Sequence, residues 1–391
     1  MDSMTKKIES LKPEMIQWRH HLHAHPETAF EEVQTAKFVA EKLQSFGLDV
    51  QQGLAKTGVV ATLTKGDDSV ERTIGLRADM DALDIREKTN VAYRSVNSGK
   101  MHACGHDGHM TMLLGAAKLL AEEELFKGSV RFIFQPAEEN EGGGGVMVAE
   151  GLFDKFPVRS IYGMHNFPTI PMGTFAIRPG PMMAAYDVFD ITVNGLGGHA
   201  AMPHLTKDPI VAASSIVNEL QTLVSRNTPP LEAAVLSVTE IHGGTAYNII
   251  PDRVEIRGTT RHFKAEIEQM LESRISEVVN GIATATGTNV DLRYRNRYPA
   301  LVNTEAETQI AVEAALETVG KGKVDADLQP IMGSEDFAFM LQTVPGAYIG
   351  IGSGSLNRTL NLHQATYDFN DEVLPIGVAY WINLVRRLLA A

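Results

Sequence analysis

Short apolar runs alternate with helix-like stretches through the first half of the chain, and this alternation limits the possible folds more than any other feature. The runs are "GVVATLT", "TIGLRADM", "SVRFIFQPAEE" and "SIYGMHN". A helical period of apolar residues precedes them in "TAFEEVQTAKFVAEKLQSFG", and another helix-like stretch, "TMLLGAAKLLAEEEL", separates the second run from the third. Nearly all-apolar strands that alternate with helices are typical of a mostly parallel sheet covered by helices. We therefore expect an α/β fold.

The pattern changes at about residue 184, where strand-like and helix-like stretches follow in the order β-α-β-β-α-β. This order predicts a ferredoxin-like arrangement. Beyond it, a helix, a strand and a terminal helix again alternate and are expected to complete the first sheet. Because 391 residues exceed what one hydrophobic core usually serves, we expect two domains. The first is discontinuous, with residues 1–183 and 299–391, and the second is an insertion at 184–298.

Composition excludes several classes of partner. A net charge of −13 and a pI near 5.5 disfavour a nucleic-acid surface, which needs a basic stripe. No uninterrupted apolar run reaches the roughly 18 residues of a membrane span. The single cysteine and the N-terminus "MDSMTKKIES", which lacks the apolar run of a secretory signal, favour a reducing cytoplasm.

Polar residues follow three of the predicted strands at their carboxyl ends. Asp79 and Asp81 come after "TIGLR", Glu138 and Glu139 follow "RFIFQPA", and His165 follows "IYGM". Ligands of open α/β sheets bind at this edge, because the strand ends and the loops after them converge there. We expect these side chains to share one rim.

A metal-binding set can be assembled from this rim and from two further motifs, "MHACGHDGHM" and "NLHQATYDF". Thiolate, imidazole and carboxylate ligands would come from Cys104, His106, Glu139, His165 and His363. Five protein ligands are too many for one open tetrahedral zinc and suit two metals about 3.5 to 4 Å apart. Glu138 is then available as a general base. Residue spacing alone favours this metal site no more than ordinary structural roles for the same residues, namely a buried cysteine, core histidines and a solvated acidic turn.

Several motifs, in fixed order, resemble the dinuclear-metal amidohydrolases that include hippurate hydrolase and the indole-acetyl-amino-acid hydrolases. Aminoacylase and carboxypeptidase G are more distant relatives. The resemblance starts at "RHHLHAHPETAFEE" and runs nearly to the C-terminus. It is carried by "GLRADMDAL", "MHACGHDGH", "FQPAEE", "GMHN", "GGHAAMPH", "AYNIIPD" and "LHQATYDFND".

The resemblance implies roles for individual residues. The five metal ligands would be those named above, with Glu138 as general base and with Asp79 and Asp107 orienting ligand histidines. The inserted segment would be a lid that carries a homodimer contact, and its His199 would enter the partner's active site to stabilise the oxyanion. Asn248 would grip the substrate carboxylate. Arg261 is a second candidate for that role, because a planar guanidinium suits bidentate recognition.

The implied activity is the metal-dependent hydrolysis of N-acyl amino acids. One departure from the wider family is that Arg77 replaces the histidine of a His-x-Asp motif, while Cys104 takes the place of a bridging aspartate. The ligand set favours two divalent ions, zinc or manganese, although cobalt or nickel would also fit. The alternatives are a metallo-dipeptidase or carboxypeptidase, and a non-catalytic metal-binding module.

Overall fold

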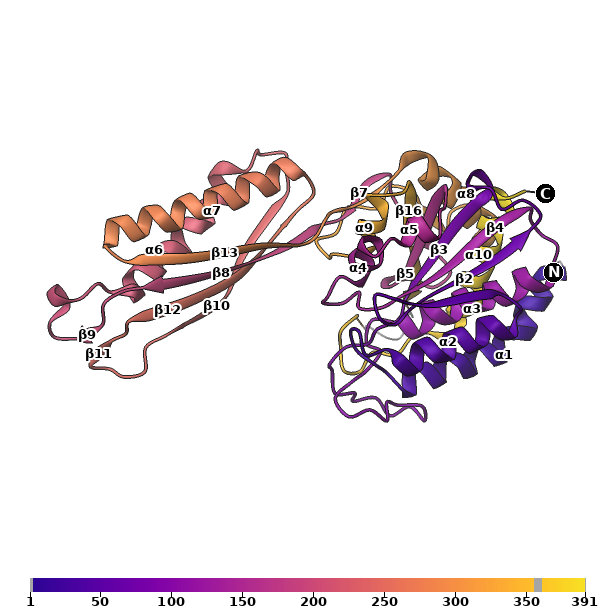
Figure 1. The fold of residues 1–391 in the computed structure, drawn as a ribbon, viewed down its shortest axis with the longest axis horizontal. Helices are drawn as coiled ribbons and strands as arrows, with labels where there is room; N and C mark the ends of the chain where they lie inside the picture. Colours follow the sequence, from indigo (N-terminus) through magenta and orange to yellow (C-terminus); the bar gives the residue numbers. More distant parts are fainter. Residues whose placement is uncertain (1–2, 355–360, 391) are drawn as a thin grey trace. The chain divides into compact units, whose positions relative to one another are not determined.

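The structure is a computed structural model that describes residues 3–354 and 361–390. The chain divides into two compact units (Figure 1). Unit 1 comprises Met1–Met182, Val302–Gln329 and Glu335–Ala391, and unit 2 comprises Met183–Leu301 and Pro330–Ser334.

Unit 1 is built on an eight-stranded sheet with the order β1-β2-β4-β3-β5-β16-β6-β15. Its four central strands, β4, β3, β5 and β16, run parallel. Outside them, β1–β2, β2–β4 and β16–β6 are antiparallel pairs, and β6–β15 is a parallel pair. The strands are β1 (Asp49–Leu54), β2 (Gly58–Lys65), β3 (Thr73–Asp79), β4 (Gly128–Gln135), β5 (Ser160–Pro171), β6 (Phe175–Ala176), β15 (Val324–Asp325) and β16 (Gly346–Gly354). This arrangement confirms the predicted α/β fold with a mostly parallel sheet.

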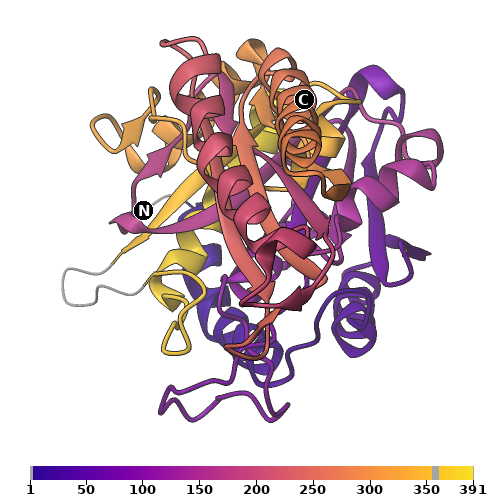
Figure 2. The ribbon, with the colours of Figure 1, turned by 90° about the vertical axis from the view of Figure 1, so that its left-hand side faces the viewer.

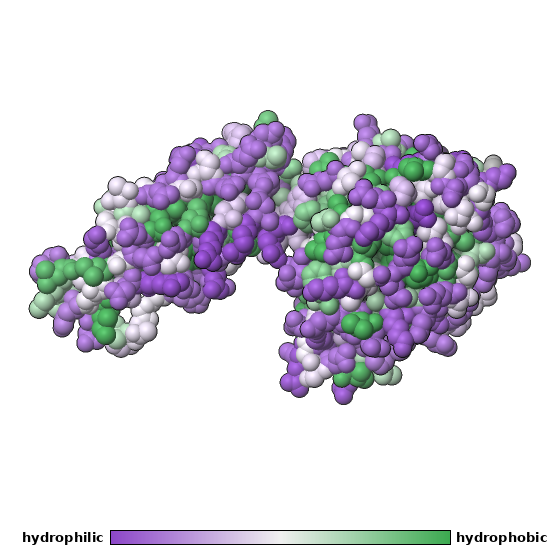
Figure 3. Space-filling model, in the orientation of Figure 1, coloured by the Kyte–Doolittle hydropathy of each residue, from purple (hydrophilic) through white to green (hydrophobic). Residues whose placement is uncertain are grey.

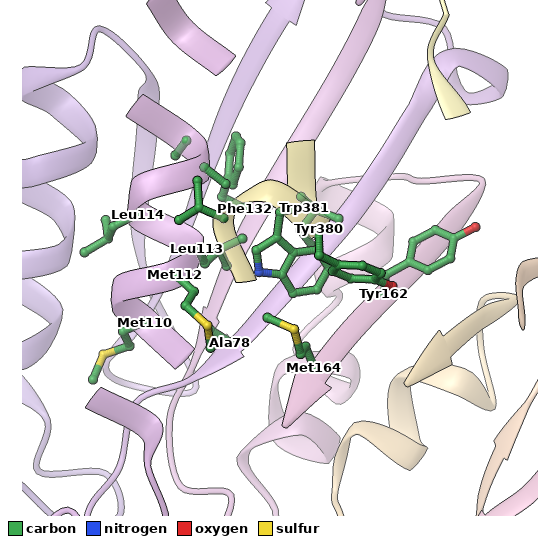
Figure 4. Packing of buried hydrophobic residues seen from close by; sticks show 14 of the residues in the cluster. Ala78, Met110, Met112, Leu113, Leu114, Phe132, Tyr162, Met164, Tyr380 and Trp381 are labelled. Atoms are coloured by element: carbon green, nitrogen blue, oxygen red, sulfur yellow. The ribbon is translucent and has the colours of Figure 1, made fainter. Parts of the chain in front are cut away.

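Long helices pack against this sheet and against one another. Figure 4 shows side chains of α3 and α10, including Met112 and Trp381, meeting Met164 and Phe132 of the sheet. The helices are α1 (Ser3–Ala24), α2 (Val33–Ser45), α3 (His106–Glu122), α4 (Gly143–Ala149), α5 (Leu152–Lys155), α8 (Glu305–Val319), α9 (Phe337–Leu341) and α10 (Leu374–Leu388), with short 3-10 turns at η1 (Val70–Arg72) and η4 (Asp371–Val373). Among the described residues, no helix combines the length and apolar character needed to cross a bilayer.

Helix α3 starts earlier than its apolar pattern predicts. The pattern begins at Thr111, but the helix begins at His106, directly after Gly105 in the left-handed conformation. A side chain at Gly105 would collide with Asn166, whose Oδ1 lies 2.2 Å from the position of a Cβ atom. The glycine therefore lets the chain turn into a helix against Asn166 of β5 and directs His106 to the sheet edge.

Unit 2 is a four-stranded antiparallel sheet with the order β10-β12-β8-β13 and two helices. The main elements are β8 (Ala185–Asn194), α6 (Pro209–Thr222), β10 (Ala234–Gly243), β12 (Arg253–His262), α7 (Ala265–Thr286) and β13 (Asn289–Tyr298). Buried residues alternate along β8, because one face of the sheet packs on α6 and α7, which lie side by side (Figure 2). The smaller elements of unit 2 are β9 (Gly198–His199), η2 (Pro203–Leu205), a π-helical turn η3 (Leu223–Asn227) and β11 (Ile249–Ile250). Two further strands, β7 (Gly180–Met183) and β14 (Leu301–Asn303), pair with each other and belong mostly to unit 1.

Candidate metal centre

Five potential metal ligands of unit 1 lie close together at the carboxyl edge of its sheet. Their ligand atoms form overlapping groups in which all atoms lie within 4.8 Å of one another. The groups are Cys104, His106 and His165; Cys104, Glu139 and His363; and His106, Glu138 and Glu139. Cys104, His106 and Glu139 each belong to two of these groups, so the arrangement suits two neighbouring ions better than one.

Two of the histidines are oriented by backbone carbonyls. His106 Nδ1 lies 2.8 Å from the carbonyl oxygen of Asp81, and His165 Nδ1 lies 2.8 Å from that of Asn166. Each ring therefore donates from Nδ1 and presents the lone pair of Nε2 to the site. His106 Nε2 is buried without a hydrogen-bond partner, and His165 Nε2 lies 3.4 Å from Cys104 Sγ. A buried, unpaired ring nitrogen is what a divalent cation would satisfy.

His363 reaches the same place from the C-terminal part of the chain. Its Nε2 lies 3.3 Å from Glu139 Oε1, which is also 3.8 Å from His106 Nε2. The backbone of His363 has a φ of 62°, a conformation that non-glycine residues rarely adopt, and its amide donates to the Ala103 carbonyl at 2.8 Å. Backbone strain of this kind is found mainly at functional sites.

The site concentrates negative charge. Burial raises the pKa of Glu138 well above its ordinary value, and the carboxylates of Glu335 and Glu139 raise it further. Burial raises the pKa of the Cys104 thiol well above its ordinary value, and Glu139, Glu138 and Asp79 raise it further. Although burial alone would lower the pKa of His106, Asp79 and Asp81 raise it to about 10. Divalent cations would compensate this charge, so the donor set fits two of them.

Asp79 is buried next to the potential ligands and is held by His109 and Arg77. Its Oδ1 lies 2.7 Å from His109 Nδ1, and its Oδ2 accepts from Arg77 Nη1 at 2.9 Å. The second nitrogen of His109 contacts the side chain and the amide of Asn166 at 2.6 and 3.0 Å. Both nitrogens of His109 are thus engaged, and Asp79 shares a further potential ligand group with His106.

Asp107 anchors the start of α3. Its Oδ2 lies 2.8 Å from His23 Nδ1 and 3.4 Å from Arg19 Nη1, and all three side chains are fully buried. Its Oδ1 accepts from the Gly108 amide at 3.0 Å. The N-terminal motif "RHHLHAHPE" therefore fixes the helix turn that carries His106.

A second acidic cluster lies beside Glu138 and was not predicted from the sequence. Glu335 and Asp336 are buried, and both accept from Arg77 Nη2, at 2.9 and 3.0 Å. Their carboxylates lie within 4.8 Å of the Glu138 carboxylate. The only sequence signal is the acidic pair in "GSEDFAFM", directly before an apolar stretch, and solvated acidic turns look the same.

The remaining predicted site residues lie in unit 2. His199 of β9 is exposed and pairs with Ile249 of β11, while the Ala200 amide donates to the Asn248 carbonyl at 3.1 Å, so His199 and Asn248 lie close together. The Ala201 amide donates to His199 Nδ1 at 3.1 Å, which places the ring proton on Nε2. Gly197 permits this packing, because its Cβ would lie 2.6 Å from the Ile250 carbonyl oxygen.

Arg261 is held elsewhere in unit 2, on β12. Its guanidinium carbon lies 4.2 Å above the Tyr186 ring, and its Nη1 donates to the Thr259 hydroxyl and to the Thr260 carbonyl. A guanidinium has five N–H donors, so the stacked side chain can still donate hydrogen bonds to a ligand.

Known proteins resemble this chain over nearly its whole length. Hippurate hydrolase from Campylobacter jejuni is 39% identical over 387 residues, which cover 99% of this chain and 100% of that protein. N-acetylcysteine deacetylase from Bacillus subtilis is 39% identical over 379 residues, covering 96% and 97%. The crystal structure of the Bacillus subtilis YXEP protein, a dinuclear metal-binding peptidase, superposes with a TM-score of 0.83 at 34% identity, over 97% of this chain and 99% of that one.

The family match covers the whole candidate metal centre. Residues 75–387 match the family described as Peptidase family M20/M25/M40, and this span includes all five potential ligands. It confirms the resemblance inferred from the motifs. The chain therefore belongs to the peptidase family M20/M25/M40.

Proposed function

We propose that this protein hydrolyses the amide bond of N-acyl amino acids and releases a carboxylic acid and a free amino acid. The observation that carries the proposal is the convergence of Cys104, His106, Glu139, His165 and His363 beside a buried Glu138. The relatives named hippurate hydrolase and N-acetylcysteine deacetylase support the substrate class.

The proposed chemistry divides between the two adjacent glutamates. Bound divalent cations would polarise the scissile carbonyl and lower the pKa of water. Glu138 would take the proton from the attacking water and pass it to the nitrogen of the leaving amine. Glu139 would bind metal together with the thiolate and the three histidines. Asp79 would act through His109, which it bonds, and Asp107 would hold the start of α3, which carries His106.

We propose that unit 2 acts as the lid and supplies the remaining groups. His199, whose Nε2 carries the proton, would donate a hydrogen bond to the oxyanion in the active site of a partner subunit. Asn248 and Arg261 would bind the α-carboxylate of the substrate.

A homodimer formed through unit 2 is supported by its surface. Figure 3 shows hydrophobic atoms at the end of unit 2 that carries β9 and β11. The exposed apolar residues of these and neighbouring segments are Leu196, Met202, Leu205, Ile210, Val211, Tyr247 and Ile249. Contiguous exposed apolar surface commonly marks a protein interface.

The mixed thiolate, imidazole and carboxylate set favours zinc, and manganese is the second choice. Cobalt and nickel would fit the same ligands. We place the reaction in the cytoplasm, because a reducing compartment would keep Cys104 available as a thiolate ligand.

A substrate panel tests the proposal. Hippurate, N-acetyl amino acids and indole-acetyl amino acids should be hydrolysed, and removal of metal by a chelator should abolish turnover. Hippuryl amide, which lacks the free α-carboxylate, is the matched control and should react poorly. Faster hydrolysis of dipeptides than of any acylated amino acid would instead support a dipeptidase or carboxypeptidase.

A further inference from the structure

The loop that carries Glu138 and Glu139 has an unusual backbone at its start. It connects the end of β4 at Gln135 with the start of α4 at Gly143. Ala137, directly before Glu138, has a φ of 57°, in the left-handed region that a residue with a Cβ atom rarely adopts. Something in the surroundings must hold the chain in this conformation.

Glu32, more than a hundred residues away in the sequence, contacts this position. It is fully buried and lies at the N-cap of α2, but its side chain makes no capping hydrogen bond to that helix. Its Oε1 instead accepts from the Ala137 amide at 2.9 Å, and its Oε2 accepts from the Thr57 hydroxyl at 2.7 Å. One carboxylate thus ties the glutamate loop to the turn between β1 and β2.

Strained backbone gathers around the same three residues. Among the described residues, the non-glycine positions with positive φ are Phe30, Ala55, Lys56, Ala137 and His363. Except for His363, a proposed metal ligand, each is Ala137 itself or lies within two residues of Glu32 or Thr57. Conformations of this kind persist where several contacts enforce them, and they are concentrated at functional sites.

Other backbone amides of the loop are bonded farther along it, and the Ala137 carbonyl accepts from the Gly143 amide at 3.0 Å. The Glu139 amide donates to Asp81 Oδ2 at 3.0 Å, and the Gly144 amide donates to Asp336 Oδ2 at 2.8 Å. These bonds hold the middle and the far end of the loop. The bond to Glu32 holds its start, at the residue that precedes Glu138.

We propose that Glu32 is a positioning residue for the glutamate pair. By accepting from the Ala137 amide it holds the backbone that directs Glu138 and Glu139 into the site. This inference builds on the roles proposed above for the two glutamates, but the contact itself does not depend on them.

The chemistry of the contact predicts which substitutions are tolerated. In Glu32→Gln the amide oxygen can still accept from the Ala137 amide, while the side-chain NH₂ can donate to the Thr57 hydroxyl. In Glu32→Ala both partners lose their bond in a buried place, which costs more than the loss of an exposed bond. Glu31→Ala is the matched control, because Glu31 is the exposed neighbour and pairs with Lys100.

Hydrogen exchange and kinetics on the full-length protein test the proposal. In the metal-stripped protein, amides of the 136–143 peptide should exchange about tenfold faster in Glu32→Ala than in Glu31→Ala. In the metal-loaded enzyme, Glu32→Ala should lower kcat by about 10-fold to 100-fold with little change in KM. The reason is that a displaced Glu138 slows the chemical step, whereas the substrate still binds. Glu32→Gln should show the exchange and the kcat of wild type.

Thr57→Val, which keeps the side-chain shape, should show a smaller change of exchange and kcat in the same direction as Glu32→Ala. It replaces Glu32→Ala in the test if that variant does not fold.

Two results would overturn the proposal. One is wild-type exchange of the 136–143 peptide in both Glu32→Ala and Thr57→Val. The other is a Glu32→Gln variant as impaired as Glu32→Ala, since the carboxylate charge and not the acceptor would then matter. The exchange measurement separates this inference from the proposed function, because loop exchange reports on Glu32 even if Glu138→Gln proves to retain full turnover.

Discussion

The two units differ in how far they bury their candidate functional side chains. In unit 1, Cys104, His106 and Glu138 are at most 7% exposed, and of the five potential ligands His363 is the exposed one, at 53% of its side chain. In unit 2, His199 is exposed on a glycine-rich segment, and Tyr247 beside Asn248 is fully exposed. The first arrangement is typical of a preformed centre, in which groups are held before any ligand arrives. The second is typical of a surface that becomes complete only on binding. This contrast predicts different behaviour of the two regions on mutation.

The largest effect is expected from the general base in the preformed region. Glu138→Gln should lower turnover about 10²-fold to 10⁴-fold, the usual contribution of a general base, and should keep both metal ions. Metal analysis and kinetics on the same preparation check this. Glu141→Gln, an exposed change in the same loop, is the control and should behave as wild type. Near-normal turnover of Glu138→Gln would remove Glu138 from the mechanism.

Replacement of the only cysteine should affect metal and activity together. Cys104→Ala should lose metal and turnover in parallel, because a bridging thiolate contributes to both sites. Alkylation of Cys104 should be slow in the metal-loaded wild type and faster after metal is removed. Equal labelling rates in the two states would mean that Cys104 is not a metal ligand and only fills space in the core.

A mixed dimer tests whether the exposed His199 of one subunit acts in the active site of the other subunit. If His199 acts in the partner's site, His199→Ala and Glu138→Gln homodimers should both be inactive, yet a mixed dimer has one intact site. Random co-assembly of the two variants should then return about a quarter of wild-type activity. Co-expression with two different tags followed by kinetic assay measures this. Recovery no greater than the sum of the separate homodimers would place His199 outside the partner's site.

The smallest effect concerns the buried anchor of α3. Burial lowers the pKa of His23, but its bonds to Asp107 and Glu87 outweigh this and raise the pKa to about 9. A raised folded-state pKa contributes stability that is fully present below about pH 6.5 and is lost as the pH rises through about 9.

Between pH 6 and pH 9.5 the free energy of unfolding should therefore fall by about 1 to 3 kcal/mol more in wild type than in His23→Gln. Denaturant titrations of the metal-stripped proteins at the two pH values measure this difference. An identical pH dependence of the two proteins would mean that His23 is not charged in the folded state.

The sequence predicted elements whose apolar pattern was complete and missed those whose pattern was weak. The fully buried strand β3 and the amphipathic α10 were expected, because burial of apolar side chains produces their pattern. Helix α1 was not expected, since Pro13 interrupts it and its apolar face is diluted by polar residues. Strand β1 was also missed, because "DVQQGL" forms a mostly exposed edge.

The candidate site was predictable only where residue types were unusual. A lone cysteine between histidines and an adjacent glutamate pair are rare enough to be noticed in one sequence. Glu32 and Asp336 could not be found in this way, because what distinguishes them is a hydrogen bond from a backbone amide far away in the chain, that of Ala137 or of Gly144. An acidic residue that accepts from a distant backbone amide leaves no local pattern.

Metal titration of the stripped protein tests the central claim most directly. Zinc or manganese is added in steps to the metal-free chain, and the rate of hippurate or N-acetyl amino acid hydrolysis is measured against bound metal. A dinuclear centre predicts no activity without metal and full activity at two bound ions per chain. Full activity at one ion per chain, or hydrolysis by the metal-free protein, would contradict the account.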